Sequence, residues 1–535
     1  MFKNHPKGLL SAALTNMGER FGFYIMMAIL TLFISSKFGL SETTTGVIYS
    51  IFYASIYVLA LVGGLIADKT RNYKRTILWG LILMAVGYFI LAVPTPTPVP
   101  SLPLYLALTC AGLLVIAFGN GLFKGNLQAL VGQMYDNPEY KKHIAEKLGM
   151  DHNGKPKDTR DAGFQIFYMF INIGGFFAPF IAIAVRNWWL KFNGFDYNAQ
   201  LPELCHQFLG NAGAMNAEQM ANLQTYSSQV MLNGSAVTDL TAFSNQYLDV
   251  FNRGFQYAFF ATIFALLISL VIYLKNKHTF PDPAAAKLKI NKDGSHSKEE
   301  ITMAASEIRQ RILALFAVFG IVIFFWFSFH QNGYSLTYFA RDYINLDAIN
   351  INLGFTSIKG AEIFQAVNPF FVVVLTPLIM WIFGSLRRRD KEPSTPKKIG
   401  IGMGIAALAY VFLLIVSMAL PDKSALANMS AGSLEAMRLT PWVMVGMYFI
   451  LTVAELFISP LGLSFVSKVA PPHLQGLMQG AWLAATALGN LFLFIGGILY
   501  TSVPLWACWM VFTIATGLSM LVMLSMVKWL ERVAK

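Results

Sequence analysis

The sequence predicts an all-α membrane protein with twelve transmembrane helices arranged as two six-helix bundles. Of its 535 residues, 56% are hydrophobic and 13% are charged, whereas roughly a quarter of the residues in soluble domains are charged. Apolar segments long enough to cross a hydrocarbon core about 30 Å thick recur along the chain. The expected spans are residues 9–35, 46–67, 76–94, 103–133, 162–185, 254–274, 312–330, 362–384, 399–420, 441–467, 474–499 and 504–527.

Two polar segments divide this array. The lysine-rich residues 275–311 are expected to be a cytoplasmic linker, and they contain no apolar run long enough for extra spans. The N-terminal bundle then comprises residues 1–185 and 254–274, and the C-terminal bundle comprises residues 312–535. Residues 186–253 are too polar to span a bilayer and too long for a simple turn. We expect this insertion to form a small helical cap on the extracytoplasmic side.

The basic residues fix the expected orientation. With the N-terminus inside, 30 of the 40 Lys and Arg residues fall on the cytoplasmic side, 8 fall on the opposite side, and Arg20 and Lys124 lie within spans. This asymmetry follows the positive-inside rule and predicts that both termini are cytoplasmic. Topology therefore accounts for the net charge of +12, and we expect no nucleic-acid partner.

The remaining composition argues against catalysis and metal binding. Of the three cysteines, Cys110 and Cys508 lie in expected spans and Cys205 lies in the insertion, so no disulfide framework or metal cluster follows. No nucleophile–base pair stands out, and we expect neither an enzyme nor a cofactor. The first span is too long for the core of a signal peptide, and we expect it to remain as a membrane anchor.

The first span carries charge near its middle. Glu19 and Arg20 share a helical stripe with Asn16, Phe23, Tyr24 and Met27. A charged side chain at the bilayer centre costs roughly 2.5–3.5 kcal/mol on insertion scales, so the stripe is expected to face protein or water. The alternatives are a structural ion pair between neighbouring helices and a transport pathway.

Two further charges lie deep in the expected spans. Lys124 is flanked by glycines in span 4, and Glu455 lies in span 10. The first bundle therefore has two bases, Arg20 and Lys124, beside Glu19, and the second has one acid. A site between the bundles would accept an anionic group on one side and a cationic group on the other. A short peptide is a zwitterion that fits this field.

Several separate motifs carry a family resemblance. Span 2 ends in GGLIADKTRNYKR, which is similar to the loop between helices 2 and 3 of the major facilitator superfamily. The segment FYMFINIGG (Phe167 to Gly175) resembles the FYxxINxG signature of the proton-coupled oligopeptide transporter (POT/PTR) family within that superfamily. NMGERFGFY in span 1 is similar to that family's ExxERFxYY. The resemblance covers most of residues 11–500 and implies the major facilitator fold.

The resemblance implies roles for the matching positions. Arg20 and Lys124 would hold the carboxylate of a peptide, and Glu455 with Asn172 and Asn368 would hold its amino terminus. An Asn-Pro pair at position 368 is also expected to interrupt span 8.

Four aromatic residues match positions that line side-chain pockets in the family. Tyr24, Trp326 and Trp482 are the stronger matches, and Tyr57 is the weaker one. Aromatic residues in helices also serve ordinary packing, so their role depends on the resemblance.

The chain departs from the family at residues that handle protons. Asn16 stands where the family has the first Glu of ExxER, and Phe23 replaces a tyrosine. Met27 stands where many members have an arginine, and His330 stands where its acidic partner would be, so no orphan charge remains. The candidates for proton coupling are then Glu19, Glu455 and His330.

The prediction is a secondary active importer of di- and tripeptides that works by alternating access, with proton coupling as the expectation from the family. We expect a multi-pass monomer surrounded by lipid in a bacterial inner membrane. The alternatives are a facilitator, a transporter of another carboxylate-bearing solute, and a peptide sensor that does not transport.

Overall fold

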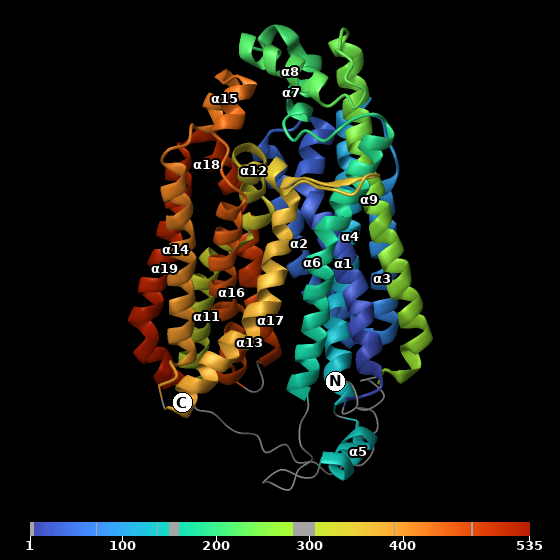
Figure 1. Ribbon diagram of the computed structural model, residues 1–535. Coiled ribbons are helices and arrows are strands. Elements are labelled where there is room, and N and C mark those ends of the chain that lie inside the picture. Colours follow the sequence, from blue (N-terminus) through green and yellow to red (C-terminus); the bar gives the residue numbers. More distant parts are fainter. Residues whose placement is uncertain are drawn as a thin grey trace.

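The computed structural model describes residues 5–70, 72–135, 137–148, 160–281, 305–389, 391–471 and 475–534. Nearly all of these residues are helical (Figure 1). The one sheet among them is a two-stranded hairpin in which β1 (Ile351–Asn352) pairs antiparallel with β2 (Ser357–Ile358).

Twelve helices or helix pairs in this part of the chain are long and apolar enough to cross a membrane, which confirms the expected number. They are α1 (Gly8–Phe38), α2 (Glu42–Thr70), α3 (Tyr73–Ala92), α4 (Leu102–Met134), α6 (Arg160–Phe192), α9 (Leu240–Asn276), α11 (Ala305–Phe329) with α12 (Ser335–Tyr343), α13 (Val367–Arg388), α14 (Thr395–Ser417), α16 (Trp442–Val469), α17 (Gln475–Leu491) with α18 (Phe494–Ser502), and α19 (Leu505–Val533). Most of the expected linker, residues 282–304, lies outside the described residues.

The spans pack as two sets that stand side by side (Figure 1). Helices α1 to α4, α6 and α9 contact one another, and α11, α13, α14, α16, α17 and α19 form the second set. Glycines allow the closest approaches in the first set. A Cβ atom on Gly121 of α4 would lie 2.4 Å from the Leu59 carbonyl oxygen of α2, and one on Gly119 would lie 2.7 Å from the backbone nitrogen of Met84 in α3. Gly119 and Gly121 thus serve helix packing, whereas a Cβ atom on Gly125 would meet nothing within 4 Å.

The polar stripe on α1 faces protein, as expected. Glu19 is 1% exposed, Arg20 is 5% exposed and Asn16 is 4% exposed. Phe23 and Met27 are also buried, and Tyr24 is half-buried. The cost of placing charge in a bilayer therefore does not arise at this stripe, because the side chains contact other helices and not lipid.

The polar insertion forms a helical cap, as expected. Helices α7 (Leu201–Asn211) and α8 (Ala217–Gln229) lie at the end of the molecule opposite both termini and the short helix α5 (Pro138–Leu148) (Figure 1). The cap leaves and rejoins the bundle at a narrow neck, where the Asp196 amide donates to the Val230 carbonyl at 2.7 Å and the Leu232 amide donates to the Gly194 carbonyl at 3.0 Å.

The helical core is longer than the expected boundaries at 186 and 253. Helix α6 continues to Phe192, and α9 begins fourteen residues before the expected span, at Leu240. Asp239 explains this start, because its carboxylate accepts hydrogen bonds from the amides of Thr241 and Ala242 and caps the helix. Hydropathy alone misses such polar helical turns beyond the membrane.

Span 8 corrects one expectation. The Asn368–Pro369 pair does not interrupt a helix, because α13 begins at Val367 and the pair belongs to its first turn. Proline is tolerated there, since the first amides of a helix have no intrahelical partner. The preceding residues form a 3-10 helix, η6 (Ala361–Ala366).

Candidate functional site

The two charges near the middle of α1 neutralise each other. Arg20 donates from Nε to Glu19 Oε2 at 2.5 Å and from Nη2 to Glu19 Oε1 at 2.7 Å. Glu19 Oε1 also accepts from Asn120 Nδ2 of α4 at 2.9 Å. The guanidinium lies 4.7 Å from the centre of the Phe23 ring. Both charges of this ion pair belong to one helix, and the Asn120 hydrogen bond links the pair to α4. Arg20 keeps further N–H donors for another anion.

Lys124 lies near an aromatic ring and not near a carboxylate. Its half-buried ammonium is 5.0 Å from the centre of the Tyr57 ring, an arrangement typical of a cation–π contact. Within the described residues, no carboxylate lies within ion-pair distance of Lys124. The first set of helices therefore presents a cation that lacks a counter-ion in the part of the chain that the structure describes.

Glu455 is the complementary group in the second set. Its Oε2 accepts from Asn368 Nδ2 at 2.8 Å, and the same amide donates to Thr452 Oγ1 at 3.0 Å. The half-buried carboxylate has no cation within ion-pair distance among the described residues. Asn172, expected to assist Glu455, instead donates to the Tyr168 carbonyl at 3.1 Å.

The two sets converge around these charges. Glu455 of α16 is hydrogen-bonded to Asn368 of α13, and Tyr53 of α2, one turn from Tyr57, contacts His330 of the second set. Gly175 of α6 lies between Tyr24 and Pro369, because a Cβ atom there would be 3.1 Å from the Tyr24 ring and 3.2 Å from Pro369 Cγ. Helices α1, α2, α6, α13 and α16 thus contribute to one region.

The two tryptophans belong to the second set. The Trp326 ring stacks on His330 with centroids 4.8 Å apart, and its indole N–H is buried without a hydrogen-bond partner among the described residues. The Trp482 ring occupies a notch in α16 that exists because residue 462 is glycine, since a Cβ there would lie 2.0 Å from that ring. Both rings are fixed by packing.

His330 is buried between aromatic and polar neighbours. Its Nδ1 lies 2.5 Å from Asn490 Oδ1, so with this amide orientation Nδ1 carries the hydrogen. Its ring centroid is 4.6 Å from that of Tyr53 on α2, which belongs to the first set. Met27 is 4% exposed and His330 is 5% exposed, so the two positions hold a buried apolar side chain and a buried imidazole in a polar contact.

Three residues near the site were not predicted. Tyr53 contacts His330, Asn120 binds Glu19, and Tyr168 is 47% exposed although it belongs to a membrane span. The four-residue spacing of Tyr49, Tyr53 and Tyr57 on one face of α2 was a usable signal, because such residues line one helix face. Asn120 gave no comparable signal.

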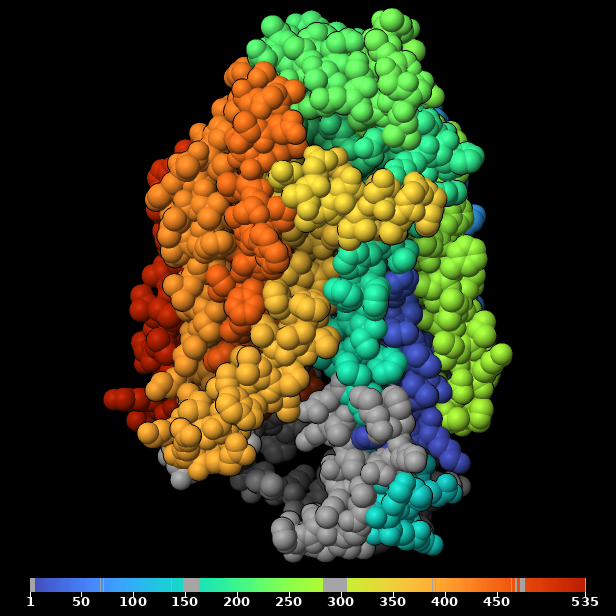
Figure 2. Space-filling view, viewed as in Figure 1, coloured from blue at the N-terminus to red at the C-terminus, as the bar shows by residue number. Residues whose placement is uncertain are grey.

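The two sets are joined by charge at the cap end. Arg186 of α6 forms an ion pair with Glu362 of η6, and both side chains are fully buried. Arg186 Nη2 also donates to the Lys359 carbonyl at 2.9 Å, and Asn187 Nδ2 donates to the Ser357 carbonyl at 2.8 Å. Figure 2 shows the segment around the β1–β2 hairpin, in yellow, lying across α6.

A second charge cluster joins the same end. Arg341 of α12 bonds to Glu42 of α2 at 2.9 Å and to Asp342 at 2.7 Å. Lys423 lies 3.1 Å from Asp342 and 3.5 Å from Glu203 of the cap. Burial alone would lower the pKa of Lys423, but Asp342 and Glu203 outweigh it and hold that pKa above its usual value. We call these two clusters the cap-end seam.

Comparison with known proteins adds family evidence. A sequence model described as the POT family matches residues 74–293 and 249–503. The chain is 27% identical to peptide transporter YePEPT of Yersinia enterocolitica, over 92% of this chain and 87% of that one. It is also 27% identical to dipeptide and tripeptide permease B of Edwardsiella piscicida, over 99% of this chain and 96% of the relative.

Solved structures share the fold. A crystal structure of a peptide transporter POT in complex with sulfate superposes with a TM-score of 0.68 at 22% identity, over 100% of this chain and 96% of that one. A POT family transporter in complex with 5-aminolevulinic acid gives a TM-score of 0.67 at 20% identity, over 100% of this chain and 98% of that one. At these identities the likeness supports the fold alone.

Proposed function

Because this chain belongs to the POT family, we propose that it imports di- and tripeptides by alternating access. The observation that carries the proposal is that each set of helices holds one charged side chain, away from its helix ends, that has no ion pair among the described residues. Lys124, in the first set, lies 5.0 Å from the centre of the Tyr57 ring, and Glu455, in the second, accepts a hydrogen bond from Asn368. A zwitterion whose ends are separated by one or two residues would satisfy both.

The residues divide between the two ends of the peptide. Lys124 and the remaining donors of Arg20 would bind the carboxylate, because a charge-assisted hydrogen bond is worth roughly 1.5–3 kcal/mol. Glu455, oriented by Asn368, would accept from the peptide's ammonium group. Asn172 would assist only after releasing the Tyr168 carbonyl.

The side chains of the peptide would lie among the aromatic residues. These residues are Tyr24 of α1, Tyr57 of α2, Trp326 of α11 and Trp482 of α17. Tyr57 contacts Lys124, and Trp482 packs against Gly462 of α16, the helix that carries Glu455. Trp326 and Trp482 are 7% and 3% exposed, so they would form a rigid wall. Tyr24 and Tyr57 are half-buried and would contact the ligand more directly.

Alternating access would use the cap-end seam as the outer gate. The lysine and arginine distribution supports an orientation with the cap outside and both termini in the cytoplasm of a bacterium. In this arrangement the outer side is closed by Arg186–Glu362 and by the cluster around Arg341. Rocking of the two sets would break these contacts and admit peptide from outside. The site is complete within one chain, which supports a monomeric transport unit.

Protons would drive the import. Asn16 cannot titrate, so coupling would use Glu19, Glu455 or His330. Glu19 is held by Arg20 and Asn120, whereas Glu455 has no charged partner among the described residues. His330 lies where the two sets meet, against Tyr53. These contacts favour Glu455 and His330 over Glu19.

A counterflow experiment separates transport from sensing. Proteoliposomes are loaded with unlabelled dialanine, and entry of radiolabelled dialanine is followed without any ion gradient. A transporter exchanges the label into the vesicles, even if it is only a facilitator. A sensor binds dialanine in a parallel titration but leaves the label outside, and that result would reject the proposal.

A further inference from the structure

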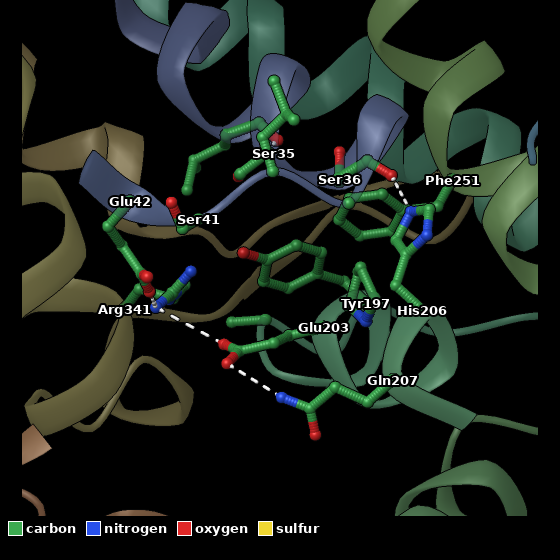
Figure 3. A pocket seen from close by; sticks show the side chains of 15 residues that line it. Ser35, Ser36, Ser41, Glu42, Tyr197, Glu203, His206, Gln207, Phe251 and Arg341 are labelled. Atoms are coloured by element: carbon green, nitrogen blue, oxygen red, sulfur yellow. Dashed lines mark hydrogen bonds and ion pairs between the residues drawn. The ribbon is translucent and has the colours of Figure 1, made fainter. Parts of the chain in front are cut away.

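A cavity lies under the cap, apart from the residues of the proposed central site. Its volume is about 350 Å³, and it is lined by the end of α1, the α1–α2 connection, the segment after α6, α7, α9 and Arg341 (Figure 3). None of the residues assigned to peptide binding lines it. We propose that this cavity binds the primary ammonium group of a small amine on the cap side of the protein.

The charge balance around the cavity favours a cation. Glu42, Glu203 and Arg341 line the cavity, and Asp342 and Lys423 adjoin them, so three carboxylates surround two cations. Arg341 is held closely by Glu42 at 2.9 Å and by Asp342 at 2.7 Å. The five groups therefore leave one negative charge in excess. That excess would be neutralised by a ligand with one ammonium group.

Glu203 is the carboxylate with capacity to spare. Its contacts are longer than those of the other acids: 3.7 Å to Arg341, 3.5 Å to Lys423 and 3.3 Å to Gln207 Nε2. An ionised carboxylate has about four acceptor sites, and none of these contacts has the 2.7–2.9 Å length typical of a strong charge-assisted bond. Figure 3 shows Glu203 beside the cavity with Arg341 on one side and Gln207 on the other.

Tyr197 provides a second and independent observation. Tyr197 is 3% exposed, and its hydroxyl points into the cavity (Figure 3). The hydroxyl has no hydrogen-bond partner among the described residues. The face of the ring packs against Arg186, whose guanidinium carbon lies 4.0 Å from the ring centre. The ring is buried while its hydroxyl opens into the cavity, so this hydroxyl is free to accept a hydrogen bond from a ligand.

The protonation states agree with an ammonium ligand. Burial raises the pKa of Tyr197, so the hydroxyl stays neutral and can accept a hydrogen bond. Burial also lowers the pKa of His206, whose Nε2 donates to the Ser36 carbonyl at 2.6 Å. His206 therefore adds no positive charge to the wall of the cavity.

Calorimetric titration of the purified full-length chain with L-lysinamide tests the proposal. This probe has ammonium groups but no carboxylate. We expect Glu203→Gln to weaken binding roughly ten- to a hundredfold, because a charged hydrogen bond is lost, and Tyr197→Phe to weaken it roughly three- to tenfold. Glu218→Gln, which changes an exposed carboxylate of α8 outside the cavity, should leave affinity unchanged. Diacetylated lysinamide should not bind.

Three results would overturn the proposal. The first is no binding of lysinamide to the wild type at millimolar concentrations. The second is binding that neither Glu203→Gln nor Tyr197→Phe changes. The third is binding that Glu455→Gln abolishes, since the probe would then occupy the central site. Thermal unfolding of each variant shows whether it is folded. If Glu203→Gln is unstable, Tyr197→Phe still tests the proposal, because it removes only one oxygen atom.

Discussion

The cap-end seam and the central site use charge in opposite ways. In the seam, Arg186 meets Glu362 and Arg341 meets Glu42, so charges from one set of helices are neutralised by the other. In the proposed central site, Lys124 of the first set and Glu455 of the second each have no ion pair among the described residues. Charges paired across the boundary hold the two sets together, and charges left without partners there are available to a ligand.

The largest expected effect comes from breaking the seam. Arg186→Met leaves the Glu362 carboxylate buried without its cation, which costs roughly 3–5 kcal/mol in the closed arrangement. That cost corresponds to a shift of about a hundredfold or more towards separated cap ends. Spin labels at positions 188 and 353, where the native side chains are exposed, would report the separation in a chain whose three native cysteines are replaced.

The double variant Arg186→Met with Glu362→Leu is the matched control for this prediction. Replacing both partners by apolar groups leaves no orphan charge, and such exchanges are often neutral. The short distance between the labels should therefore return. An unchanged distance in Arg186→Met alone would show that this pair does not hold the seam.

The next effect is on the two ends of the substrate. Lys124→Ala should weaken the binding of dipeptides that have a free carboxylate. Glu455→Gln should weaken the binding of dipeptides that have a free amino terminus. Each loss is expected to be roughly ten- to a hundredfold. Titration with N-acetylated and C-amidated dipeptides is the control, because each blocked peptide should lose its sensitivity to one of the variants. Equal affinities in both variants and the wild type would reject the site.

The contrast between the regions also explains what the sequence could predict. The spans and the buried α1 stripe follow from local hydropathy and helical spacing, and the structure confirms them. The cap-end seam cannot be predicted from such local patterns, because Arg186 and Glu362 are 176 residues apart and each looks like an ordinary charge at a helix end. Long-range pairing has no local signal.

The central site lies between these extremes. Family motifs placed Asn368 beside Glu455, and the two are hydrogen-bonded. The same motifs grouped Asn172 with them, yet its amide donates to a carbonyl of its own helix. Tyr53 was not predicted, although it lies four residues before Tyr57 on the same face of α2. The reason is that its partner, His330, belongs to the other set of helices.

A smaller effect is expected at the point where the two regions meet. His330→Gln should spare dipeptide exchange between equal pools but weaken pH-driven accumulation several-fold, because exchange needs only alternating access. Glutamine keeps a hydrogen-bond donor for Asn490 but cannot titrate. Parallel counterflow and pH-jump assays on the same vesicles measure both. Accumulation at the wild-type level would make the histidine structural and Glu455 the leading proton carrier.

The smallest effect is expected from the cap. Replacing residues 199–228 by a short Gly-Ser linker removes Glu203 and both cap helices but keeps the neck at Asp196 and Val230. Half-exposed ion pairs contribute roughly 0–1 kcal/mol, so dipeptide affinity should change by no more than about fivefold. Size-exclusion chromatography and dipeptide titration check this. Loss of monodisperse protein, or of dipeptide binding in folded protein, would place the cap in the core machinery.

Uptake of radiolabelled dialanine into proteoliposomes, with and without an inward proton gradient, tests the central claim most directly. The account predicts accumulation above the external concentration when the gradient is imposed, and only equilibration when it is absent. Binding without any uptake would contradict transport. Equal uptake under both conditions would contradict proton coupling and would identify the protein as a facilitator.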